Sequence, residues 1–405
     1  MTKIVDIEDI RKKREKKEIG IPIENINKKE LKRRGHEIGD ILGCDEKGEE
    51  ICVRKGKGNL YVDGDMEKEQ LFDFMRSQIY QNIQRGDSMV IVDLGSRIYK
   101  RELWIYLTIH GYRVDSYNMD CMTESDCFNC LDGLGAENEE QIVMIANDII
   151  DDQKYKFMTY PVETACKALL SAVLLASLTE MEESDRNMLE IATIFRLGVS
   201  GTMLDKILHV MFEELDETSS AKQLFAMYSE AEEGIRMEAI QKIGNALAVY
   251  EKRANGSLCD NFRTNRYDME MPVKEKSVLF IESGQLPEDK VLFSVFMERL
   301  YDSMLKKAEE RQQDVTVMLL DYPYYGGLCG LEKYMEEGPE KGICTTLYED
   351  DRKLDGSGYA PHLVELYSLC DISVCIKDTE IPLCEIEKCE NPVTGECSKR
   401  KDGSC

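Results

Sequence analysis

The stretch MVIVDLGSRIYK (residues 89–100) has the pattern of a strand, a tight turn and a helix. Four apolar residues (89–92) lead to Asp93, and a Gly-Ser turn follows before a helix that we expect to begin near Arg97. Continuous apolar runs of this length are typical of strands that are buried on both faces, as in parallel sheets. The stretch therefore predicts an α/β fold, with Asp93 at the end of a buried strand.

Strands and helices alternate on both sides of this stretch. Because residues 314–322 are almost entirely apolar, we expect that strand to lie in the centre of the sheet. Such alternation is typical of a parallel sheet with crossover helices. The predicted strands are 59–64, 88–95, 112–119, 276–283, 314–322, 341–349 and 371–378, and the predicted helices are 67–84, 100–111 (closed by Gly111), 287–311, 328–338 and 359–369.

The alternation stops between residues 137 and about 255, where the apolar residues recur with helical periodicity. We therefore expect an α/β domain that is split by an all-helical insertion. The predicted divisions are a basic polar N-terminal arm (1–50), the first half of the α/β domain (51–135), the insertion (136–258), the second half of the α/β domain (259–380) and a Cys-containing tail (381–405).

The charge of the chain argues against general nucleic-acid binding. The formal net charge is -26 over 405 residues. Residues 1–35 hold twelve Lys/Arg and seven Asp/Glu, a net of +5, so the remainder carries -26 - 5 = -31. An acidic surface repels phosphate backbones, so we expect little DNA binding overall.

The apolar runs and the cysteines indicate the cellular compartment in which we expect the chain to reside. The longest apolar patch, ALLSAVLLASL (168–178), is too short to cross a bilayer and predicts a buried helix instead. The 15 cysteines are odd in number and scattered, and the N-terminus is charged rather than signal-like. We expect reduced thiols in a cytoplasmic chain without a transmembrane segment, which reaches a membrane only through its partners.

Seven segments, taken together and in order, resemble the conjugative type IV coupling proteins of the TraG/TraD-like family. The resemblance covers roughly residues 55–380 and leaves out the family's N-terminal membrane anchor. The segments are MVIVDLGSRIYKREL (89–103), HGYRVDSYNM (110–119), SDCFNCLDGL (125–134), RNMLEI (186–191), VTVMLLDYPYYGGL (315–328), KGICTTLYEDDRKL (341–354) and LCDISVCIKDTE (369–380).

This resemblance implies a RecA-like P-loop NTPase-type parallel sheet with the all-α insertion. Coupling proteins are hexameric, membrane-anchored ATPases that pass a relaxase-bound DNA strand to a type IV secretion channel. In ring-forming ATPases a strand such as 88–95 lies beside the strand that feeds the phosphate loop. We therefore expect strand 88–95 beside strand 59–64.

The phosphate-loop position departs from the family's pattern. A phosphate loop needs glycines, then Lys and Ser/Thr, so that backbone N–H groups and a positive charge surround the phosphates. Counted from Gly64, the corresponding residues are Glu69, Gln70 and Leu71. The sequence therefore predicts an ordinary strand-to-helix turn, with acidic residues that the helix dipole favours.

The other motor positions are changed as well. Asp321 ends the predicted central strand as a Walker B aspartate would, but Tyr322 stands where the family has the catalytic Glu. Glu349 stands where the resemblance places a phosphate-sensing Gln, and Leu-Gly-Ser follows Asp93 where the family has Pro-Lys-Gly. Changes at several independent positions predict that the fold is kept and that ATPase activity is lost. Neither ATP nor Mg²⁺ is expected as a cofactor.

Cysteines and histidines offer little other chemistry. Cys127 and Cys130 form one pair, with no second pair at zinc spacing, so we expect structural thiols. The tail holds four thiols with spacings that fit no standard zinc knuckle, so a zinc site there stays an alternative to a disordered thiol-rich tail. The four tail cysteines are Cys384, Cys389, Cys397 and Cys405.

These observations favour a degenerate relative of the coupling proteins that acts by protein–protein interaction in conjugation or type IV secretion. Its expected partners are a coupling protein, relaxosome components or channel components, in a homo- or hetero-oligomer. Two alternatives remain open. One is an active DNA translocase with an atypical nucleotide site, and the other is an acidic cytoplasmic scaffold unrelated to conjugation.

Overall fold

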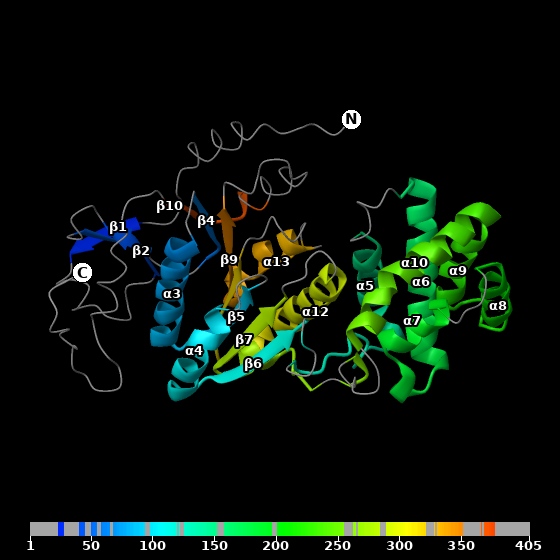
Figure 1. Ribbon diagram of the computed structural model, residues 1–405, viewed down its shortest axis with the longest axis horizontal. Helices are drawn as coiled ribbons and strands as arrows, with labels where there is room; N and C mark the ends of the chain where they lie inside the picture. Colours follow the sequence, from blue (N-terminus) through cyan, green and yellow to red (C-terminus); the bar gives the residue numbers. More distant parts are fainter. Residues whose placement is uncertain are drawn as a thin grey trace.

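A seven-stranded parallel sheet with helices on both faces forms one part of the molecule, and a bundle of helices lies beside it (Figure 1). The computed structural model describes residues 23–27, 40–44, 50–54, 58–64, 68–93, 98–119, 121, 125–151, 158–196, 201–254, 262–264, 266–283, 289–320, 328, 330–350, 366 and 368–376.

The seven strands lie in the order β10-β4-β9-β8-β5-β7-β6, and every neighbouring pair is parallel. The middle position belongs to β8, as its apolar sequence predicts. Strands from both sides of the helical insertion join in this one sheet, as expected. Their bounds are β4 Leu60–Gly64, β5 Ser88–Asp93, β6 Arg113–Asn118, β7 Ser277–Glu282, β8 Val315–Leu319, β9 Ile343–Asp350 and β10 Ile372–Ile376.

The predicted adjacency of strands 88–95 and 59–64 is wrong. β5 pairs with β7 and β8, whereas β4 pairs with β9 and β10. Both β8 and β9 therefore lie between β4 and β5. The reason is that crossover connections of a dozen or more residues let a strand join a parallel sheet away from its sequence neighbour. The order of strands along the chain does not fix their order in the sheet.

Helices cover both faces of the sheet. On one face, α3 (Lys68–Arg85) and α4 (Ile98–Ile109) pack on strand residues such as Val62 and Ile91. On the other face, α12 (Lys290–Lys307) and α13 (Leu331–Glu337) pack on the alternating residues, among them Tyr61 and Val90. This alternation follows from the two-residue period of a strand. Gly111 follows α4 with a φ of +79°, as the predicted helix end requires.

The insertion connects β6 to β7, which are neighbours in the sheet. Its long helices are α5 Glu139–Asp151, α6 Tyr160–Glu180, α7 Met188–Arg196, α8 Gly201–Glu213, α9 Ser220–Ser229 and α10 Glu233–Ala254. Short helical turns complete the described chain: η3 Ala136–Asn138, η5 Glu183–Asp185, α11 Met271–Lys274, η7 Ala308–Glu310 and η9 Pro339–Lys341. The core of the bundle is continuous with the core beneath α12.

Helix α6 is the centre of the bundle. With 21 residues it is long and apolar enough to cross a membrane, but 72% of its apolar window is buried inside the protein. Residues 168–178 lie within it, so the predicted buried helix is confirmed, although the helix is longer than that patch. A membrane span would present its apolar residues to lipid, whereas this helix presents them to its neighbours α5, α9 and α10.

A second, antiparallel sheet lies in the N-terminal region. It has the order β1-β3-β2, with β1 Ile23–Asn27, β2 Asp40–Cys44 and β3 Glu50–Arg54. β1 and β2 fall inside the segment 1–50, which the sequence predicts as a polar arm, and β3 begins at its last residue, Glu50. That segment is therefore partly folded. Its short strands mix charged and apolar residues without a strong alternation, which explains why the pattern does not predict them.

Candidate functional site at the carboxyl edge of the sheet

All seven strands end at the same edge of the sheet, because they are parallel. Ligands of open α/β folds bind outside this carboxyl edge. Gly64 ends β4, Asp93 ends β5, Glu282 ends β7 and Asp350 ends β9. The fold therefore gathers the sequence-predicted positions of β4, β5 and β9 at one edge.

Gly64 is the residue from which a phosphate loop would start. It pairs in register with Ile376 of β10 on one side and with Asp350 of β9 on the other. The preceding residue, Asp63, pairs with Glu349 of β9. The strand end that would feed a phosphate loop is thus flanked by three acidic positions.

Helix α3 begins at Lys68, so the connection from β4 spans only residues 65–67. Glu69, Gln70 and Leu71 consequently lie in the first turn of the helix. A helix N-terminus attracts phosphate when its N–H groups are open and a basic side chain is close. An acidic residue in this turn is favoured by the helix dipole but opposes a second anion. These residue types differ from the Gly, Lys and Ser/Thr of a phosphate loop.

The Walker B position lies two residues beyond β8, which ends at Leu319. Asp321 and Tyr322 are outside the described residues. Glu349 lies within β9. The sheet order places β9 between β4, which ends at Gly64, and β8, which ends at Leu319.

Asp93 and Glu282 face each other at the ends of β5 and β7. They are partners in the register of the two strands, and each is 3% exposed. Two carboxylates at neighbouring strand ends are costly to bury unless a cation or donor accompanies them. Lys100, in the first turn of α4, supplies that cation: its Nζ lies 2.8 Å from Glu282 Oε2.

Lys100, Ser116 and Glu282 form a closed polar network. Lys100 Nζ also donates to Ser116 Oγ over 2.8 Å, and Ser116 Oγ donates to Glu282 Oε2 over 3.0 Å. A Ser-Lys pair can act as nucleophile and base, but here the ammonium group is a counter-ion to a buried carboxylate. The network is therefore structural, and it fixes α4 against β6 and β7.

A second ion pair lies just beyond the end of β7. Asp289, at the start of α12, is fully buried and receives two hydrogen bonds from Arg253, at 2.6 and 2.7 Å. Ser283 Oγ donates to the same carboxylate over 2.6 Å. This network joins the last helix of the insertion to the carboxyl edge of the sheet.

Acidic residues outnumber basic ones at the described strand ends of this edge. Its acidic strand-end positions are Asp63, Asp93, Glu282, Glu349 and Asp350. The two cations described above, Lys100 and Arg253, are each already bound to a buried carboxylate.

Cysteine chemistry is equally limited in the described part of the chain. Cys127 and Cys130 are 5% and 2% exposed, and burial raises the pKa of Cys130 to about 12. Such thiols are inert, as expected for structural cysteines. Among the residues that the structure describes, no three His, Cys, Asp or Glu residues are grouped to hold a metal ion. The four tail cysteines lie outside those residues.

Sequence reasoning missed both polar networks. Lys100 and Glu282 are 182 residues apart, so only the pairing of β6 with β7 brings them together. The one available signal was a charged residue at the end of a predicted apolar strand. Such a residue is expected at the carboxyl edge of the sheet, but the signal does not identify its partner.

Comparisons with known proteins agree on the fold. The trigonal form of the bacterial conjugative coupling protein TrwBΔN70 in complex with sulphate has a TM-score of 0.59 and 15% identity, and the match covers 87% of this chain and 78% of that chain. The plasmid coupling protein TrwB with the non-hydrolysable ATP analogue ADPNP has a TM-score of 0.56 and 15% identity over 86% and 77%. No protein-family model and no curated protein matches the sequence.

The fold is therefore the RecA-like P-loop NTPase fold, a parallel sheet interrupted by an all-α insertion. At this level of identity the likeness concerns the fold alone.

Proposed function

We propose that this chain is a coupling-protein-like component of conjugative DNA transfer that works through protein–protein contacts and does not hydrolyse ATP. The likeness to a conjugative coupling protein over 86–87% of the chain supports the association with transfer. The residue types at the carboxyl edge support the loss of ATPase activity. The described helices of the insertion share one continuous buried core, which supports a retained binding role.

One observation carries the proposal. The strand end that would feed the phosphate loop is followed by Glu69, Gln70 and Leu71 in the first turn of α3, beside acidic positions of β9. A phosphate loop needs Gly, Lys and Ser/Thr at those places, because each contributes a distinct contact to phosphate or Mg²⁺. A protein that keeps the sheet while losing these contacts is a scaffold rather than a motor.

The interaction role is tested in cells that express a conjugation system. The tagged chain is purified with and without the transfer proteins, and the relaxase and the coupling protein are quantified in the eluate. The proposal predicts stoichiometric recovery of at least one of them and a lower transfer frequency when the chain is deleted. If no transfer protein co-purifies and the transfer frequency is unchanged, the association with conjugation is wrong.

A further inference from the structure

Helix α8 carries apolar residues both on the side that is buried against the bundle and on an exposed side. Leu204, Leu208 and Phe212 are buried against the bundle. A second stripe follows the same helical spacing beside them. With about 100° between successive residues, this stripe covers a continuous arc of the helix surface. The stripe consists of Met203, Ile207, Val210 and Met211, which we call the α8 outer face.

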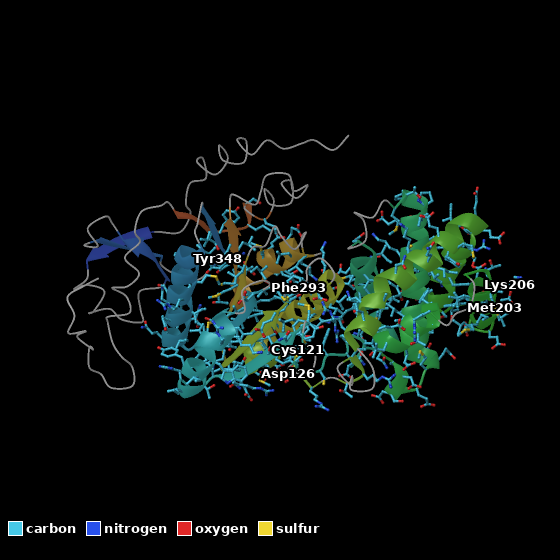
Figure 2. The ribbon with its side chains drawn as sticks, in the orientation of Figure 1. Cys121, Asp126, Met203, Lys206, Phe293 and Tyr348 are labelled. Atoms are coloured by element: carbon cyan, nitrogen blue, oxygen red, sulfur yellow. The ribbon has the colours of Figure 1, made fainter. Side chains whose placement is uncertain are left out.

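The α8 outer face is exposed. Met203, Val210 and Met211 are 57%, 59% and 53% exposed, and Ile207 is 39% exposed. Nine large apolar side chains are exposed in the described part of the chain, and five of them lie on α8 and its neighbour α9, where Met227 is the fifth. Figure 2 shows Met203 and Lys206 at the outer end of the bundle, pointing away from the sheet. A concentration of exposed apolar residues on one helix marks an interaction site.

Acidic residues are concentrated beyond the C-terminal end of this face, while the exposed Lys206 lies beside the stripe on α8. They lie at the end of α8, in the turn to α9 and after α9, and all are exposed: Glu213, Glu214, Asp216, Glu217, Glu230 and Glu232. The cation of the same turn, Lys222, is held by Glu217 and by the carbonyl oxygens of Glu213 and Leu215. An apolar stripe with this acidic rim at its C-terminal end complements a segment that is apolar on one side and positively charged on the other.

We propose that the α8 outer face binds a positively charged amphipathic helix of a partner protein. Unbranched methionine side chains adapt to different apolar surfaces, and methionine-rich surfaces are used to bind varied helices. Anchors at positions i, i+4, i+7 and i+8 of α8 would pack against a matching stripe on the incoming helix. This inference rests on the proposed interaction role and names the kind of partner that such a role would use.

Two other occupants fit less well. The chain's own basic segment RKKREKK (11–17) precedes β1, which lies at the opposite end of the molecule from α8 (Figure 1). An anionic membrane would be repelled by the acidic rim. A separate helix with lysine or arginine on its polar side satisfies both the stripe and the rim.

The test uses a synthetic fluorescent helix with leucine at i, i+3, i+4 and i+7 and lysine elsewhere. Binding to the full chain is followed by fluorescence anisotropy. We expect a dissociation constant in the micromolar range and weaker binding at high salt. The double variant Ile207→Asp with Met211→Asp should bind at least about tenfold more weakly. Ile207→Leu, which keeps the stripe, should bind like the natural sequence.

A matched control places the same two charges on other exposed apolar residues. Ile105 and Ile109 on α4 are 70% and 64% exposed, and the double variant Ile105→Asp with Ile109→Asp should leave binding unchanged. The inference is overturned by an absence of binding, by equal binding of a peptide with glutamate in place of lysine, or by an unaffected double variant. Self-association that the double variant abolishes would show that a second copy of the chain binds this face instead. Preferential binding to phosphatidylglycerol vesicles would show that a membrane binds it instead. Nucleotide binding and co-purification with transfer proteins are measured separately, so each proposal can fail alone.

Discussion

Arg253 at the end of α10 and Asp289 at the start of α12 form a bidentate ion pair, with N···O distances of 2.6 and 2.7 Å. Asp289 is fully buried and the Arg253 side chain is 11% exposed. The pair joins the insertion to the sheet beside the end of β7. The pair therefore attaches the bundle to the carboxyl edge of the sheet.

Removing Arg253 should destabilise the protein strongly. Arg253→Ala leaves the buried Asp289 carboxylate without its cation, which typically costs about 3–5 kcal/mol. Arg253→Lys keeps the charge but loses the bidentate geometry, so its loss should be smaller. Urea denaturation measures both. As a control, Arg263 forms a 2.9 Å pair with Glu190 and is 52% exposed, so Arg263→Ala should cost about 1 kcal/mol or less. Equal losses at the two arginines would contradict this account.

Glu298 of α12 meets Asp148 of α5 at a second junction between sheet and bundle. Burial, together with the neighbouring Asp148, raises the pKa of Glu298 from its ordinary value of 4.5 to about 10. Burial and the nearby Asp148 carboxylate both disfavour the ionised form of Glu298. The folded protein therefore keeps a proton here at neutral pH.

The stability of the protein should fall as the pH rises. Between pH 4.5 and about 10 the unfolded chain has lost the Glu298 proton, while the folded protein retains it. The unfolded state then binds fewer protons, so the free energy of unfolding decreases by up to about 1.4 kcal/mol per pH unit. Urea denaturation at pH 6 and pH 9 should show this decrease. Glu298→Gln should reduce it, whereas Glu309→Gln, at an exposed position, should not. If the free energy of unfolding changed with pH in the same way for all three proteins, Glu298 would not retain a proton at neutral pH.

Buried thiols should resist alkylation in the native protein. Burial raises the pKa of Cys130 and of Cys166 to about 12, and both side chains are at most 2% exposed. Only the thiolate reacts, so iodoacetamide at pH 8 should leave both residues unmodified until the protein is unfolded. Peptide mass spectrometry before and after denaturation checks this. Rapid native labelling of either residue would show that the bundle or its junction opens readily.

Much of the sheet could be predicted from sequence. The continuous apolar runs of β5 and β8 mark buried strands, and their predicted limits differ from the observed ones by at most three residues. The order of strands could not be predicted in the same way. β8 and β9 enter the sheet between β4 and β5, although they follow the insertion in the chain, and only tertiary packing decides that position.

The sequence predicts which candidate-site residues lie at the ends of strands, but it does not predict which residues they contact. Gly64, Asp93 and Glu349 lie at the carboxyl edge as strand-end patterns indicate. The partners of the buried charges were not foreseen, because Lys100 reaches Glu282 and Arg253 reaches Asp289 only after the sheet and bundle have assembled. Local patterns carry no information on such distant pairs.

Calorimetric titration of the purified protein with Mg-ATP tests the central claim most directly. The account predicts no heat of binding even at millimolar nucleotide, because the phosphate-loop residues are absent and the edge is acidic. A matched variant that carries Glu69→Gly, Gln70→Lys and Leu71→Thr shows whether those residue types alone limit binding. Binding of Mg-ATP to the natural sequence with a micromolar dissociation constant would contradict the account and restore an ATP-driven motor as the leading interpretation.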